Sequence, residues 1–146
     1  MAAIDCQVPE FNPEDEEIRE ILATHRTVAV VGLSPKPHRD SFKVAKYLQE
    51  HGYRIVPVNP RAREILGEKG YASLRDIPFP VDIVDIFRNI DAIPGVVDEA
   101  IAIGAKVVWM QLGLAENQSA RRARDAGLKV VMNKCSKIEH SRYFPG

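Results

Sequence analysis

The sequence lacks the features that mark several classes of protein. Its 146 residues include only two cysteines, Cys6 and Cys135, which is too few for a disulfide framework. Basic and acidic residues both number 20, so the net charge of zero gives nucleic acids and anionic membranes no overall attraction. No apolar run approaches the ~20 residues of a membrane span, and the N-terminus does not resemble a signal peptide. We therefore expect a cytoplasmic protein that binds neither nucleic acid nor membrane.

Short apolar runs alternate with amphipathic segments along the chain. The expected strands are residues 27–31, 53–58, 82–87, 106–110 and 128–132. Glycines at 52, 104 and 127 close the helical segments before three of these strands. This alternation predicts a Rossmann-like α/β fold, a doubly wound parallel sheet of five strands in the order 3-2-1-4-5. Pro57 fits a central strand poorly because it has no N–H to donate, so it indicates a strand end or a bulge.

A chain of this length is typical of a single domain. An additional acidic helix is predicted before the first strand, over residues 14–24, with Asn12 and Pro13 at its start. We expect an N-terminal tail over residues 1–12, one domain over 13–142, and a C-terminal tail over 143–146. No helix is predicted after the fifth strand, and His140 is assigned to the tail of the chain.

The loop after the first strand is a candidate phosphate site. In doubly wound sheets, ligands lie outside the carboxyl ends of the strands, where the strand order reverses. Gly32 ends the first strand, but Ser34 and Pro37 stand where a dinucleotide fingerprint requires glycine. Lys36 and Arg39 bring positive charge to the start of the next helix, whose free N–H groups attract anions. Phosphate binding is favoured here over a merely basic surface loop.

The loop after the second strand argues against NAD. An NAD-binding unit carries an acidic residue here to bind the ribose hydroxyl, whereas this chain has Arg61 and Arg63. Two arginines favour a nucleotide with an additional ribose phosphate, which describes both NADP and coenzyme A (CoA). The alternative is a solvated arginine pair. Elsewhere, Gln111 is a candidate polar contact, and Cys135 is interpreted as a small buried residue rather than a reactive thiol.

Five segments, in the same order along the chain, resemble the small stand-alone CoA-binding proteins. These proteins are relatives of the CoA-binding domain of the succinyl-CoA synthetase α subunit. The matching segments are 30–37, 57–60, 82–88, 108–113 and 132–135, and the resemblance extends over about residues 14 to 142. It implies a Rossmann-like fold with CoA lying across the carboxyl ends of the strands.

The resemblance also implies three groups of binding residues, while the sequence itself predicts no catalytic constellation and no metal-ligand spacing. The phosphate group would be Gly32, Ser34 and Lys36, with Arg39 and Ser41 near the helix start. The adenosine 3′-phosphate group would be Val58, Asn59, Pro60 and Arg61. The group lining the loop where the pantetheine arm leaves would be Phe87, Arg88 and Ile93.

The expected function is binding of CoA or acyl-CoA without chemistry of its own, as a carrier, a sensor or a partner of an acyl-CoA enzyme. The synthetase uses a phosphorylated histidine in a further ligase domain, which has no counterpart in this sequence. Two alternatives stay open. One is an NADP-dependent oxidoreductase, and the other is a protein-interaction subunit with a vestigial nucleotide site.

Overall fold

Five parallel strands form one sheet in the computed structural model, which describes residues 7–145. Cys6 lies outside the described residues. The strands are β1 (Thr27–Val31), β2 (Arg54–Val58), β3 (Ile83–Ile86), β4 (Val107–Met110) and β5 (Lys129–Val131). Every expected strand is present, with each end within one residue of its predicted position. The Rossmann-like α/β class is confirmed.

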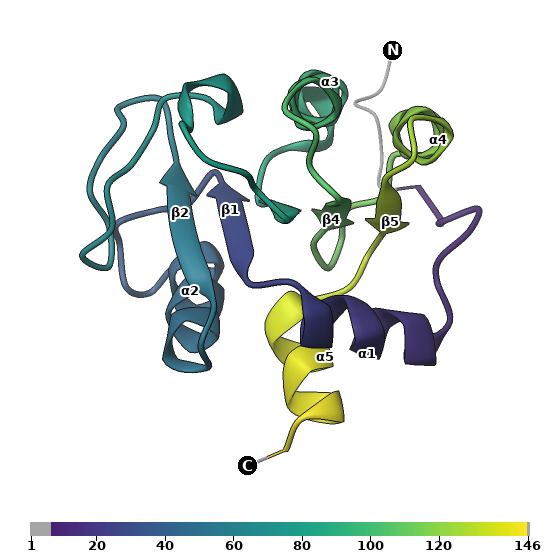
Figure 1. Ribbon diagram of the computed structural model, residues 1–146, viewed down its shortest axis with the longest axis horizontal. Helices are drawn as coiled ribbons and strands as arrows, with labels where there is room; N and C mark the ends of the chain where they lie inside the picture. The colour runs from purple at the N-terminus through teal and green to yellow at the C-terminus, as the bar shows by residue number, and fades with distance from the viewer. Residues whose placement is uncertain (1–6, 146) are drawn as a thin grey trace.

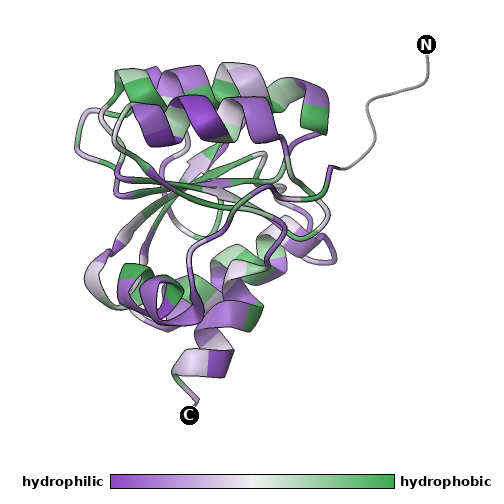
Figure 2. Ribbon diagram, turned by 90° about the vertical axis from the view of Figure 1, so that its right-hand side faces the viewer, coloured by the Kyte–Doolittle hydropathy of each residue, from purple (hydrophilic) through white to green (hydrophobic). Residues whose placement is uncertain are grey.

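Helices cover both faces of the sheet, which makes three layers (Figures 1 and 2). On one face lie α1 (Asp15–Thr24), α2 (Asp40–Glu50) and α5 (Ser136–Tyr143), and on the other lie α3 (Ile93–Ala102) and α4 (Asn117–Asp125). Two short 3-10 helices, η1 (Leu74–Asp76) and η2 (Ile90–Ala92), complete the described elements. Because strand residues alternate between the faces, β3 contributes Ile83 to one apolar cluster and Val84 to the other.

The strand order is 2-1-3-4-5, so the predicted order 3-2-1-4-5 is wrong. β1 pairs with β2 on one side and with β3 on the other. Pro57 gives the physical reason, since a residue without an N–H is tolerated on an edge strand such as β2. All four residues of β3 are buried, including Asp85, as an interior position requires. The order therefore reverses between β1 and β3, which moves the expected ligand site to those two strand ends.

The helix α5, over Ser136–Tyr143, was not expected from the sequence. Its inward face is polar, since Ser136, Glu139 and His140 are buried whereas Ile138 is exposed. An apolar period therefore could not reveal it. The Nδ1 atom of His140 lies 2.8 Å from the Tyr47 hydroxyl on α2, so the assignment of His140 to a tail is wrong.

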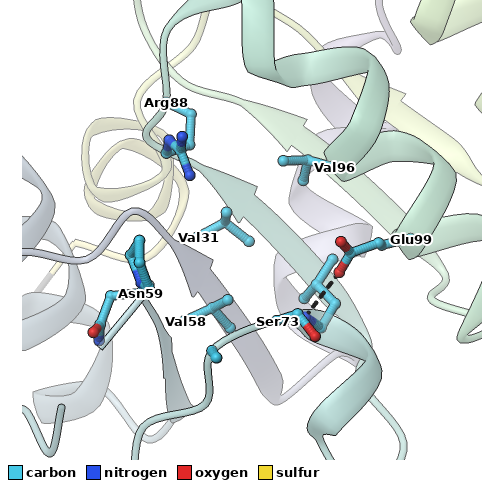
Figure 3. Close-up of a pocket in the computed structure, with 10 residues that line it drawn as sticks. Val31, Val58, Asn59, Ser73, Arg88, Val96 and Glu99 are labelled. Carbon is cyan, nitrogen blue, oxygen red and sulfur yellow. Dashed lines mark hydrogen bonds between the residues drawn. The ribbon is translucent and has the colours of Figure 1, made fainter. Parts of the chain in front are cut away.

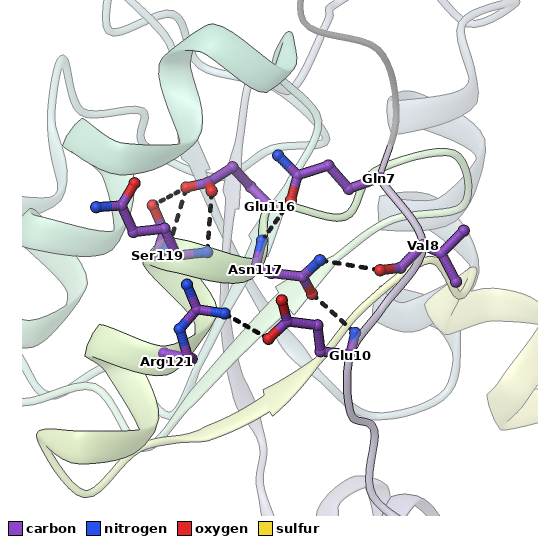
Figure 4. A network of polar contacts seen from close by, with 8 residues as sticks. Gln7, Val8, Glu10, Glu116, Asn117, Ser119 and Arg121 are labelled. Carbon is purple, nitrogen blue, oxygen red and sulfur yellow. Dashed lines mark hydrogen bonds and ion pairs between the residues drawn. The ribbon is translucent and has the colours of Figure 1, made fainter.

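Residues 7–12, which we call the N-terminal arm, lie against the start of α4 and the end of β5 (Figure 4). The Asn117 amide donates to the carbonyl of Val8 and accepts from the N–H of Glu10, both at 2.9 Å. Asn12 pairs with both backbone groups of Met132, at 2.7 and 2.9 Å, instead of capping α1. The arm is therefore attached to the domain by hydrogen bonds between asparagine side-chain amides and backbone groups.

Candidate functional site

The ends of three strands converge on Gly32. Its N–H donates to the carbonyl of Val58 at 2.8 Å, and its φ of +88° lies in the region that favours glycine. A Cβ at this position would lie 2.3 Å from the carbonyl oxygen of Phe87 and 2.9 Å from Cδ of Arg88. Only glycine therefore allows the chain leaving β1 to pass this close to the end of β3.

Two serines shape the loop that follows. The N–H of Ser34 donates to the Ser41 hydroxyl at 3.0 Å, and the N–H of Lys36 donates to the Ser34 hydroxyl at 3.1 Å. Within residues 7–145, the N-cap of α2, Arg39, makes no side-chain cap hydrogen bond. The first N–H groups of α2 are thus available to an anion.

An open pocket of about 500 Å³ lies over this helix start. Its lining residues are Gly32, Ser34, Lys36, Arg39, Asp40, Ser41 and Phe87, and we call it the basic pocket. Lys36 and Arg39 supply two positive charges, and the carboxylate of Asp40 offsets one of them. The helix start adds partial positive charge, so the pocket favours an anion.

A second, smaller pocket of about 80 Å³ lies between the ends of β1, β2 and β3 and helix α3 (Figure 3). We call it the strand-end pocket. Val31, Val58, Asn59 and Arg88 line it from the strand side, and Glu99 lines it from α3. Val31 directly precedes Gly32 and Arg88 directly follows Phe87, so both pockets lie at the same carboxyl edge of the sheet.

Asn59 organises the turn beside the strand-end pocket. Its Oδ1 accepts hydrogen bonds from the N–H groups of Arg61 and Arg63, at 3.2 and 3.1 Å. Ala62 between them adopts a φ of +49°. Among residues 7–145, the buried Nδ2 of Asn59 has no hydrogen-bond partner. The turn leaves both arginine side chains exposed at the edge of the sheet.

The structure brings together most of the site residues expected from the sequence. Gly32, Ser34, Lys36, Arg39, Ser41 and Phe87 line the basic pocket. Val58, Asn59, Pro60 and Arg88 line the strand-end pocket. Arg61 lines neither pocket, and Ile93 is fully buried in the core at the start of α3. Sequence reasoning missed Val96 and Glu99 on α3, and it also missed Ala72, Ser73 and Leu74 in the segment before β3; all five line the strand-end pocket.

A third pocket of about 400 Å³ continues beyond the basic pocket, and we call it the apolar pocket. Its lining residues are Asp40, Lys43, Val44, Phe87, Gln111, Leu112, Leu114, Cys135, Lys137 and Ile138. The sequence singled out Gln111 and Cys135, and Cys135 is a half-buried free thiol. Leu112 belongs to the expected loop after β4. Ile138 was not predicted as a site residue, because it lies on α5, a helix that the sequence pattern did not indicate.

A buried carboxylate holds the wall of the apolar pocket. Gln111 and Ser136 both donate to Asp85, the latter at 2.9 Å, and the Gln111 amide also donates to the Ser136 hydroxyl at 2.9 Å. Burial raises the pKa of Asp85 to about 7, against the opposing effect of the hydrogen bonds from Gln111 and Ser136. The network joins the ends of β3 and β4 to α5. It also occupies the side-chain amide of Gln111, whose nitrogen donates to Asp85 and Ser136 and whose oxygen accepts from the N–H of Ser136.

Two further features are absent from residues 7–145. No three histidine, cysteine, aspartate or glutamate side chains gather as a metal site would require. No helix in that range has the length and apolar character needed to cross a membrane.

The sheet and its pockets define a Rossmann-like α/β protein with a basic pocket where the strand order reverses. A family model for the CoA binding domain matches residues 26–141, and the chain belongs to this family. The resemblance noted in the sequence is thereby confirmed.

Three known proteins show how similar this chain is to others. The uncharacterized protein YneT of Bacillus subtilis is 42% identical over 130 residues, which cover 89% of this chain and 96% of YneT. A solved structure of a hypothetical protein from Pyrococcus horikoshii superposes with a TM-score of 0.88 at 44% identity, covering 96% of this chain and 99% of that one. The α subunit of the ADP-forming acetate–CoA ligase II of Pyrococcus furiosus is 40% identical over 111 residues. That match covers 75% of this chain but 24% of the ligase subunit.

Proposed function

We propose that this protein binds CoA or acyl-CoA across the carboxyl ends of β1, β2 and β3. The observation that carries the proposal is the basic pocket. Lys36, Arg39 and the open start of α2 surround a space that suits a pyrophosphate, and Gly32 lets the loop close against β3. The match to the CoA binding domain family supports CoA as the source of that pyrophosphate.

The adenosine end of CoA would extend from the basic pocket toward the strand-end pocket. Arg61 and Arg63 are exposed beside it, on a turn held by Asn59. Long cationic side chains at this edge would reach a phosphate on the ribose, whereas NAD has only hydroxyl groups there. The arginine pair thus favours CoA over NAD.

The proposed role is binding without chemistry, as a carrier, a sensor or a partner of an acyl-CoA enzyme in the cytoplasm. The ligase subunit that matches this chain does so over only 24% of its own length. Ligase activity is therefore not carried over from it.

Calorimetric titration with CoA and dephospho-CoA tests the proposal. Wild type should bind CoA roughly ten- to hundredfold more tightly than dephospho-CoA, since a charge-assisted hydrogen bond contributes ~1.5–3 kcal/mol. Arg61→Ala should remove most of this preference while leaving dephospho-CoA binding nearly unchanged. Lys36→Ala should weaken both ligands together, because Lys36 is assigned to the shared pyrophosphate.

Lys46→Ala, an exposed position further along α2, is the matched control and should change neither affinity. Equal binding of CoA and dephospho-CoA by wild type would refute the role of the arginines. Tighter binding of NADPH than of CoA would favour the oxidoreductase alternative. Binding of none of these ligands would favour a vestigial site and would overturn the proposal.

A further inference from the structure

We infer that the apolar pocket receives the acyl group of an acyl-CoA, and that a short or medium acyl chain is bound more tightly than free CoA. The inference rests on the proposed function, since it assumes the pyrophosphate lies in the basic pocket. Asp40 and Phe87 line both the basic pocket and the apolar pocket, so the two spaces are continuous.

The direction of the ligand follows from the order of the pockets. The pyrophosphate of CoA has adenosine on one side and the pantetheine arm on the other. With adenosine toward the strand-end pocket, the pantetheine arm must leave past Phe87 into the apolar pocket. The thiol or thioester at the end of the arm therefore lies among the side chains contributed by the loop after β4 and by α5.

Those side chains suit an acyl chain better than a polar group. Three large apolar side chains are exposed among residues 7–145, and two of them, Leu112 at 65% and Ile138 at 54%, line this pocket. Leu114 adds a further apolar wall. Gln111 also lines the pocket, but its amide is committed to Asp85 and Ser136. Free CoA would leave Leu112 and Ile138 exposed, whereas an acyl chain would cover them.

One charged residue of this pocket, Asp40, also lines the basic pocket and so lies where the pantetheine arm would enter. Asp40 and Lys43 come from the first turn of α2, and Lys137 comes from α5, and all three are exposed. They are suited to the two amide groups of the arm, which need hydrogen-bond partners or water. The apolar residues are then left for the carbon chain.

The size of the pocket limits the length of the chain. At about 30 Å³ per water-sized group, 400 Å³ holds roughly thirteen such groups. The cysteamine end of CoA and the thioester oxygen take about five of them, which leaves room for roughly eight carbons of acyl chain. Burying a methylene tightens binding about three- to fourfold. Affinity should therefore rise with chain length and stop rising near eight carbons.

Calorimetric titration with CoA, acetyl-CoA, butanoyl-CoA, hexanoyl-CoA and decanoyl-CoA tests the inference. In wild type, hexanoyl-CoA has four more methylenes than acetyl-CoA and should bind roughly 80- to 250-fold more tightly. Decanoyl-CoA should bind less than about threefold more tightly than this trend gives when it is extrapolated to eight carbons. In the double variant Leu112→Ser/Ile138→Ser, the gain from acetyl to hexanoyl should fall below about fivefold. Val8→Ser is the matched control, because Val8 is the third exposed apolar side chain and lies on the N-terminal arm.

The outcomes separate this inference from the proposed function. Failure of wild type to bind CoA at all would overturn both. CoA binding without any gain from a longer acyl chain would overturn the acyl pocket and leave CoA binding intact. A chain-length gain that survives in the double variant would place the acyl group elsewhere and would also overturn the inference. A gain kept by Val8→Ser and lost by the double variant would support it.

Discussion

Replacing Gly32 by alanine tests the close approach of β1 and β3 on which the site depends. An L-residue at a φ of +88° costs about 1–2 kcal/mol. The new Cβ would also lie 2.3 Å from the carbonyl oxygen of Phe87, and relieving such an overlap costs about 1–3 kcal/mol. Together these effects should destabilise the protein by about 3 kcal/mol. With a urea m-value of about 2 kcal/mol/M, the midpoint should fall by about 1.5 M.

Gly52→Ala provides the matched control, since Gly52 has a φ of +92° but no atom beyond its own chain neighbours lies within 4 Å of the place that a Cβ would take. It should lose only the conformational part, about 1–2 kcal/mol. The difference between the two midpoints isolates the contact with the carbonyl of Phe87. Equal losses in the two variants would refute the reasoning. CoA binding by Gly32→Ala, measured by calorimetry, should also weaken at least about tenfold, because β1 and β3 must separate.

The remaining predictions concern pH and the N-terminal arm. Burial raises the folded pKa of Asp85 above its unfolded value. Wild type should therefore lose stability relative to Asp85→Asn as the pH rises from about 4 to about 7, by at most about 1.4 kcal/mol per pH unit. A difference in unfolding free energy between the two proteins that stays the same at all pH values, measured by urea unfolding, would contradict this. Burial, followed by the charges of His51 and Arg26, lowers the pKa of His140. The stabilisation that neutral His140 gives the folded protein is therefore fully present above the unfolded pKa of about 6.5 and is lost as the pH falls through the lowered value. His140→Gln should remove that acid-side loss from thermal unfolding curves, and an unchanged pH profile would count against it. Asn117→Ala should cost about 1–3 kcal/mol and speed proteolysis of the N-terminal arm, because the two hydrogen bonds from the Asn117 side chain to the backbone of the arm are lost; an arm cleaved at the wild-type rate would show that its other contacts are sufficient to hold it.

The sequence predicted the strands well because each is a short, mainly apolar run that is followed within two residues by glycine or a polar residue. It did not predict their order, because apolar runs mark burial and not neighbours. The one informative residue was Pro57, whose missing N–H favours an edge position. In agreement with this preference, β2 lies at the edge of the sheet and β3 lies beside β1.

The basic pocket was predictable because all of its lining residues except Phe87 follow β1 and open α2. The other pockets were less accessible to sequence reasoning. Glu99 reaches the strand-end pocket from the middle of α3, and Ile138 reaches the apolar pocket from a helix with a polar inward face. The positions of such residues depend on how separate segments pack against one another. The spacing of residues within a single segment carries no information about that packing.

The two outer strands of the sheet carry a consequence for how copies of this protein meet. A bare sheet edge invites strand addition from another chain, and this leads to aggregation. On β2, Tyr71 already binds the carbonyl of Pro57 and the N–H of Asn59. Beyond β5, which has three residues, Asn12 occupies both backbone groups of Met132. The chain itself thus covers the C-terminal end of β2 and the residue after β5, which leaves less of each sheet edge open to strand addition from another copy.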